Sequence, residues 1–332
     1  MKKAHLTFLL ILLVSITNCS KSAKNNEILD RNMFPHSKSF GFRFRQVLDQ
    51  NHLYEEASGL CLSNQKKGLI WIHNDSDGEN ALFLINPSDG SYKGKLIIEG
   101  ISNRDWEDIC SSYDSTSKES IIYIADIGDN QNIFSTKYIY EIEEPKIPSY
   151  NDFIIKTKVK EIRKFFYPKD PHQDAESIFI NPEEQRLYII NKNETVSSLY
   201  SIDLTLANHQ VSAAKFETLI PLNYITSADY NSKRNWLILR NYNDIFLWKK
   251  DSIPFDQVFQ SDPIRLVNKY EPQGEGICWN EDATGYFTIH EQGKGMPVGI
   301  SFYKELQDQK NNATPTEGLP LETSKKLESY DN

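Results

Sequence analysis

The stretch Asp105-Trp106-Glu107-Asp108-Ile109-Cys110 indicates the fold of this 332-residue chain, because its outline recurs four more times. Each copy has an acidic or small-residue entry followed by an apolar residue, and leads through a polar turn into a β-rich run. The other copies occupy residues 56–61, 174–179, 226–231 and 273–278. Successive copies begin 47 to 69 residues apart, a spacing typical of the blades of a β-propeller.

Strand and turn signals after each copy fit one four-stranded blade, whose innermost strand is the copy itself. In the first blade, strands are expected at residues 69–72, 81–85 and 94–98, with a Pro-containing turn at 86–90. The other blades repeat this order. Their second strands are expected at residues 121–125, 187–190, 236–239 and 286–289, their third at 138–142, 198–202, 245–248 and 298–303, and their fourth at 162–167, 216–220 and 264–267.

The fifth blade lacks a fourth strand of its own, because residues 304–332 are polar and without alternation. A spare strand is expected at residues 41–48, at the other end of the chain. Pairing the two would close the ring and remove an exposed sheet edge. The sequence therefore predicts an all-β chain with a single propeller over residues 40–303, built from five four-stranded blades. The alternative is six blades, with a degenerate one inside the long second repeat (105–173).

The N-terminus has the pattern of an export signal. Two lysines precede an apolar run too short to span a bilayer as a mature helix, so residues 1–18 are interpreted as a signal peptide. They end at Ile16-Thr17-Asn18-Cys19, which resembles the lipobox of bacterial lipoproteins and implies that Cys19 is lipidated. We expect residues 19–39 to form a flexible tether and residues 304–332 a polar, disordered tail. The expected location is the bacterial cell envelope, held by the lipid, with secretion or a periplasmic location as the alternative.

Composition limits the partners. The net charge of −9 argues against nucleic acid, whose phosphates require clustered Lys and Arg. Cys61, Cys110 and Cys278 all stand in the sixth place of the repeated stretch, which favours small buried residues between blades. No Cys or His spacing supports zinc. We expect a monomer that contacts the membrane only through its anchor.

Aligned entries place acidic residues in two columns. The first column holds Glu56, Asp105, Asp174, Thr226 and Gln273, and the third holds Ser58, Glu107, Glu176, Ala228 and Glu275. Strand alternation puts both columns on one face. Innermost strands line a propeller's central channel, so six carboxylates are expected to converge on one axis. Like charges at close range raise one another's pKa values, so a compensating cation is expected, and Ca²⁺ suits oxygen ligands.

Turns after the second strands supply further oxygens and two histidines. Asn74 and Asp75, then Asp126, Asp129 and Asn130, then Asn191, Asn193 and Asn241 follow these strands. From this set Asn74, Asp126 and Asn191 are expected as supporting ligands. His73 and His290 occupy matching places in blades one and five and are the candidate bases. A purely structural interpretation remains open, because Asp and Asn are common turn residues. Arg104 and Arg240 could also neutralise carboxylates without a metal.

Several stretches resemble a largely uncharacterised family of bacterial propeller proteins. They are Glu56-Ala-Ser-Gly-Leu, His73-Asn-Asp-Ser, Asp105-Trp-Glu-Asp-Ile, Asp126-Ile-Gly-Asp-Asn, Asp174-Ala-Glu-Ser and Gly274-Glu-Gly. More distantly, the layout is similar to calcium-dependent propeller hydrolases: propeller phytases, paraoxonase, gluconolactonase-like enzymes and calcium apyrases. That resemblance implies Ca²⁺ near the channel mouth, held by Glu, Asp and Asn. The fourth blade departs from it, since Thr226 and Ala228 stand where acids are expected.

Two functions remain open at this stage. The first is a Ca²⁺-dependent hydrolase of phosphoesters, esters or lactones, with Glu107, Glu176 and Glu275 as the main ligands. The second is a non-catalytic propeller that binds a small molecule or an envelope ligand at the channel mouth. It is favoured by the absence of a serine nucleophile motif or a phosphate-binding loop. Propellers serve many functions, so the fold alone does not decide between the two.

Overall fold

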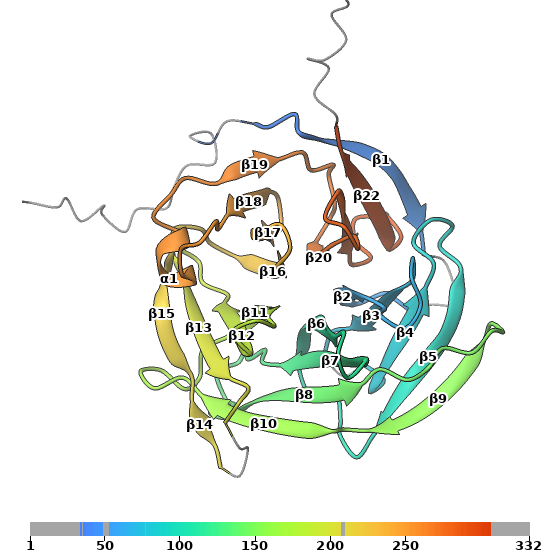
Figure 1. The fold of residues 1–332 in the computed structure, drawn as a ribbon, viewed down its shortest axis with the longest axis horizontal. Helices are drawn as coiled ribbons and strands as arrows, with labels where there is room; N and C mark the ends of the chain where they lie inside the picture. The colour runs from blue at the N-terminus through green and yellow to red at the C-terminus, as the bar shows by residue number, and fades with distance from the viewer. Residues whose placement is uncertain (1–33, 35, 49–52, 77, 207–209, 307–332) are drawn as a thin grey trace, which may run out of the picture.

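Antiparallel pairing of consecutive strands builds five sheets that stand around a central axis (Figure 1). The computed structural model describes residues 34, 36–48, 53–76, 78–206 and 210–306. The expected signal peptide, Cys19, most of the tether and nearly all of the polar tail lie outside these residues. No helix within them is long and apolar enough to cross a membrane.

Each sheet is one blade, and its strands follow the chain from the channel outwards. The first blade contains β2 (Ala57–Leu62), β3 (Ile70–Asn74), β4 (Ala81–Ile85) and β5 (Tyr92–Glu99). The second contains β6 (Trp106–Asp114), β7 (Glu119–Asp126), β8 (Lys137–Glu143) and β10 (Glu161–Phe166). The third contains β11 (Ala175–Asn181), β12 (Arg186–Asn191), β13 (Ser197–Asp203) and β15 (Lys215–Ile220). The fourth contains β16 (Ile225–Asn231), β17 (Trp236–Asn241), β18 (Ile245–Lys249) and β19 (Ile264–Leu266), with the short helix α1 (Phe255–Val258) before β19.

The fifth blade closes the ring with the N-terminal strand. It contains β20 (Gly274–Trp279), β21 (Gly285–His290), β22 (Gly299–Glu305) and β1 (Phe40–Val47). Strand β1 pairs antiparallel with β22, from Phe40 opposite Glu305 to Val47 opposite Gly299. The fully buried ring of Phe40 lies 5.3 Å from that of Tyr286 and 5.9 Å from that of Trp279. The prediction of five blades and a ring closed by the N-terminal strand is therefore confirmed.

The alternative of six blades is wrong, because the long second repeat contributes an additional strand to the first blade. Strand β9 (Phe153–Lys158) comes from the connection between β8 and β10 and pairs parallel to β5 (Figure 1). Similarly, β14 (Ser212–Ala213) of the third blade pairs parallel to β10 of the second. These connections tie neighbouring blades together at their outer edges.

A glycine makes room for β9 on the first blade. A Cβ atom at Gly94 would lie 2.5 Å from the Phe153 ring, which packs directly on the glycine. We expect Gly94→Ala to lower the free energy of unfolding by about 1–3 kcal/mol, the usual cost of overpacking. Urea denaturation measures this change. In a Phe153→Ala background the cost should largely vanish, because the ring that the new methyl group would meet is gone. An equal cost in both backgrounds would contradict this explanation.

Apolar side chains fill the spaces between neighbouring blades. Five clusters of buried residues correspond to the five blade-to-blade interfaces around the ring. The rings of Trp71, Trp106, Trp248 and Trp279 are all at most 2% exposed, so these residues serve packing. Such packing holds the five inner strands rigidly around the channel, where their first residues form one mouth.

Candidate metal-binding mouth of the central channel

Every inner strand is bulged at the same place, near the mouth. The pairing of each with its second strand shifts between the pairs Ala57/Leu60, Trp106/Asp108, Ala175/Ser177, Ile225/Ser227 and Gly274/Ile277. A bulge bends the strand and re-aims a side chain, and bulges are frequent beside functional sites. The bulges contain Ser58, Glu107, Glu176, Thr226 and Glu275.

The structure shifts the alignment of the fourth entry by two residues. The Ser58 hydroxyl donates to the carbonyl of Glu107 on the next blade, and the Thr226 hydroxyl donates to that of Glu275 at 2.9 Å. Thr226 therefore occupies the third place, not the first, and Ala228 lies two residues further along. The misplacement arose because the fourth entry has no carboxylate at this level to mark its register. The fourth blade presents a hydroxyl at this level of the channel.

Carboxylates from four blades meet at this mouth. They form three overlapping groups, in each of which one oxygen per residue lies within 4.8 Å of the others. The groups are Glu56, Asp75 and Glu291; Asp75, Asp105 and Glu107; and Glu107, Asp174 and Glu176. We call these seven residues the acidic mouth. Asp75 and Glu107 each belong to two groups, so the carboxylates are continuous around the mouth.

Burial and mutual repulsion raise the pKa values of several of these carboxylates. Burial, followed by Glu176 and other carboxylates, raises the pKa of Glu107 well above its ordinary value. Burial and Asp75 raise the pKa of Asp105 to about 7. For Glu291, burial and the charges of Asp75 and Glu56 raise the pKa to about 7. Such shifts show that the mouth lacks enough positive charge to hold all its carboxylates ionised.

Glu107 is the most confined of these carboxylates. Its side chain is only 4% exposed, and Oε1 has no hydrogen-bond partner among the described residues. Gly128, in the turn after β7, makes room for it, because a Cβ there would collide with Glu107 Oε1 and the Asp105 carboxylate. A buried oxygen without a partner is costly. A bound cation would satisfy it.

The supporting ligands predicted from the turns lie in other contacts. Asp126 accepts from Arg104 Nε at 2.8 Å and from the Tyr140 hydroxyl at 3.0 Å. Asn191 donates to Gln173 Oε1 at 2.8 Å and accepts from the Ser198 amide. Asn74 donates to the Leu53 carbonyl at 2.8 Å, while its Oδ1 is buried without a partner. Asp126 belongs to none of the three carboxylate groups of the mouth. Asn74 and Asn191 stay predicted ligands, because these groups consist of carboxylates.

Glu275 lies beside the acidic mouth rather than within its three groups. It is 5% exposed, and burial, then Glu176 and Glu291, raise its pKa well above the ordinary value. The positive charges of Arg240 and Lys192 oppose this rise, so Glu275 interacts both with carboxylates of the mouth and with two cations.

The two histidines are fully buried and bonded to the backbone. Nδ1 of His73 lies 2.7 Å from the Asn74 carbonyl, and Nε2 accepts the Gly59 amide at 3.2 Å. Nδ1 of His290 lies 2.7 Å from the Glu291 carbonyl, and its Nε2 has no partner in the described part of the chain. Burial lowers the pKa of His73 to about 4 and that of His290 below its ordinary value. Both rings are therefore neutral and position the turns that carry mouth carboxylates.

Three residues of the candidate site were missed or undervalued from the sequence. Asp75 was noted as a turn oxygen but not as a ligand, and it joins two of the three groups. Glu291 and Lys192 were not noted at all. Their signal is positional: Lys192 and Glu291 directly follow the last residue of a second strand, as Asp75 does in the first blade.

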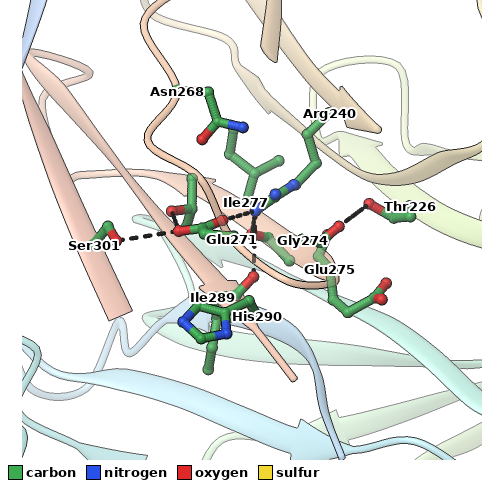
Figure 2. Close-up of polar contacts among 12 residues, drawn as sticks. Thr226, Arg240, Asn268, Glu271, Gly274, Glu275, Ile277, Ile289, His290 and Ser301 are labelled. Atoms are coloured by element: carbon green, nitrogen blue, oxygen red, sulfur yellow. Dashed lines mark hydrogen bonds and ion pairs between the residues drawn. The ribbon is translucent and has the colours of Figure 1, made fainter. Parts of the chain in front are cut away.

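The two arginines proposed as counter-ions neutralise carboxylates outside the acidic mouth. Arg104 pairs with Asp126 at 2.8 Å, and Arg240 pairs with Glu271 at 2.9 Å, a fully buried contact (Figure 2). The ammonium of Lys192 instead pairs with Glu176 in the mouth itself. Six of the seven carboxylates of the acidic mouth thus have no ion pair among the described residues.

The opposite end of the channel opens into a cavity of about 490 Å³. Cys61, Cys110, Cys278 and Asp229, one from each of four inner strands, contribute to its wall. The thiols are free and at most 4% exposed. Burial raises their pKa values well above the ordinary one, so they are protonated and unreactive.

No protein-family model matches the chain, and no curated protein matches it in sequence. Among solved structures, the WD40 domain of Pan2 from Neurospora crassa is similar, with a TM-score of 0.35 and 7% identity. The alignment covers 78% of this chain and 66% of that one, slightly less than two thirds of its length. This is a likeness of fold alone.

Proposed function

We propose that the chain is a divalent-cation-binding propeller, with Ca²⁺ as the first candidate. The observation that carries this is Glu107 Oε1, which is buried and has no hydrogen-bond partner among the described residues. Glu107 also belongs to two of the three carboxylate groups. Ca²⁺ takes six to eight oxygen ligands in flexible geometry. Glu107, Asp75, Glu56 and Glu291 would supply them, and solvent or ligand oxygens would complete the shell.

A hydrolase of phosphoesters, esters or lactones is the catalytic form of this proposal. A bound cation polarises a scissile group and lowers the pKa of a coordinated water. The proton acceptor would be a carboxylate of the mouth. Asp105 fits this role, because its pKa of about 7 lies near the working range of a general base. The buried, neutral histidines are less suited to it.

A non-catalytic binding protein is the second candidate. It is favoured by the two histidines, since both are fully buried and engaged with the backbone. In that case the cation would bridge the mouth to an anionic small molecule or envelope ligand. We further propose, from residues 16–19 alone, that Cys19 carries the lipid that holds the protein at the envelope.

Thermal unfolding of the full-length protein tests cation binding. We expect Ca²⁺ at 100 times its dissociation constant to stabilise the protein by about 2.7 kcal/mol relative to EDTA. This corresponds to a rise of about 5–10 °C in Tm. Glu107→Gln should remove most of the rise. Glu281→Gln is the matched control, because Glu281 lies beside the cavity at the opposite end of the channel.

The outcomes separate the candidates. An equal Tm in EDTA and in millimolar Ca²⁺ would rule out the cation site. If Ca²⁺ binds, a panel of esters, lactones and phosphoesters distinguishes the two forms. Turnover that is lost in Asp105→Asn while Ca²⁺ still binds would identify a hydrolase. No turnover across the panel would favour the binding protein.

A further inference from the structure

Lys192 brings a fixed positive charge into the acidic mouth. It follows β12, and its backbone amide donates to the Asp174 carbonyl at 3.0 Å. Its side chain reaches inward to an ion pair with Glu176, and the two side chains are 19% and 5% exposed. The Tyr242 ring lies 5.6 Å from the ammonium, close enough for a cation–π contact. Backbone, carboxylate and ring thus hold the ammonium in one place.

The ammonium remains charged there. Burial by itself would lower the pKa of Lys192, but the attraction of Glu176 outweighs it and raises the pKa above the ordinary value. Glu176 belongs to the third carboxylate group, with Glu107 and Asp174. Within the described residues, no ion pair reaches Glu56, Asp75, Asp105 or Glu291, which make up the rest of the mouth. The charge of the mouth is therefore neutralised on one side only.

We propose that Lys192 is a built-in counter-ion that excludes divalent cations from the group Glu107–Asp174–Glu176, so that they bind only around Asp75. This inference rests on the proposed cation binding and specifies where it occurs. A dication at the third group would have to share Glu176 with an ammonium, and like charges at that range repel. Removal of the ammonium frees the Glu176 oxygens and leaves three carboxylates within 4.8 Å of one another. One additional cation site then opens.

Equilibrium dialysis of the full-length protein against radioactive Ca²⁺ measures the number of ions per chain. We expect Lys192→Met to bind one more Ca²⁺ than the wild type. Lys192→Arg keeps the charge and should bind the wild-type number. Lys294→Met is the matched control for net charge, because Lys294 lies in the loop after β21, outside the carboxylate groups. It should also bind the wild-type number.

A second variant keeps the inference testable if Lys192→Met does not fold. We expect Glu176→Gln to leave the number of bound ions unchanged, since Lys192 already engages Glu176, whereas Asp75→Asn should reduce it. A loss of one Ca²⁺ in Glu176→Gln, or the same number in Lys192→Met as in the wild type, would overturn the role of Lys192. A wild type that binds no Ca²⁺ would refute the proposed function. In that case one ion bound by Lys192→Met would still support the inference.

Discussion

Arg240→Met is expected to lower the free energy of unfolding by about 3–5 kcal/mol, because it leaves the carboxylate of Glu271 buried without its main partner. Both side chains are fully buried, and the two charged groups are 2.9 Å apart (Figure 2). Burial raises the pKa of Glu271, but Arg240, the Thr288 hydroxyl and other partners lower it below the ordinary value. Glu271 is therefore ionised in the native protein and depends mainly on Arg240, with Arg45 as a second ion-pair partner at 3.3 Å.

Arg240 also joins the fourth blade to the fifth beneath the mouth. It donates to the carbonyls of Gly276 and Ile289, each at 3.2 Å. Gly274 makes this possible, because a Cβ there would collide with the guanidinium. Since Gly274 precedes Glu275, the arginine fixes the backbone that carries a carboxylate beside the mouth. A lysine has neither the reach nor the planar set of donors, so Arg240→Lys should recover little of the stability.

Urea denaturation of three variants measures this effect. In the double variant Arg240→Met/Glu271→Gln the cost should be smaller than in Arg240→Met, because Glu271 no longer carries a buried charge whose remaining ion-pair partner is Arg45, at 3.3 Å. Lys95→Met is the control for an exposed pair, that of Lys95 with Glu79, and should cost less than about 1 kcal/mol. If Arg240→Met cost no more than Lys95→Met, the buried pair would not stabilise the ring.

The ring could be predicted from the sequence because its signals are local and repeated. Entry stretches such as 105–110, the Pro-containing turn at 86–90 and the missing outer strand after residue 303 each mark one element. Together they fix the number of blades and the strand that closes the ring. Strand β9 could not be predicted in the same way, because its partner β5 belongs to another repeat, and parallel pairing leaves no turn signal between them.

The candidate site was predicted less completely, for two physical reasons. The fourth entry has no carboxylate at the level of Glu107, Glu176 and Glu275, so its sequence does not mark the register and Thr226 was assigned to the wrong place. The second reason is that turn residues reach the mouth from the end of a blade's second strand, whereas the entry residues stand at the start of its first strand. Asp75 approaches Asp105 and Glu107 in this way, across a blade interface that no local pattern reports. The central glutamates were predictable, but their neighbours depended on the closed ring.

Without a bound cation, the protein is expected to lose stability as the pH rises from 5.5 to 8. The pKa of Asp75 is raised to about 6, mainly by burial, and those of Asp105 and Glu291 to about 7. The folded state therefore keeps protons that the unfolded chain releases near pH 4. Stability from such groups is complete below pH 4 and is lost as the pH rises through 6 to 7. We expect Tm in EDTA to be about 5 °C lower at pH 8 than at pH 5.5.

Saturating Ca²⁺ should reverse this dependence, because a cation binds ionised carboxylates and competes with their protons. The gain in Tm over EDTA should then be largest at pH 8 and small at pH 5.5. In Asp105→Asn the fall in EDTA should become shallower, since one of the repelling carboxylates is gone. Greater stability in EDTA at pH 8 than at pH 5.5 would mean that the carboxylates are compensated from within the chain. The mouth would then not require a metal, and Glu107 would owe its burial to the fold alone.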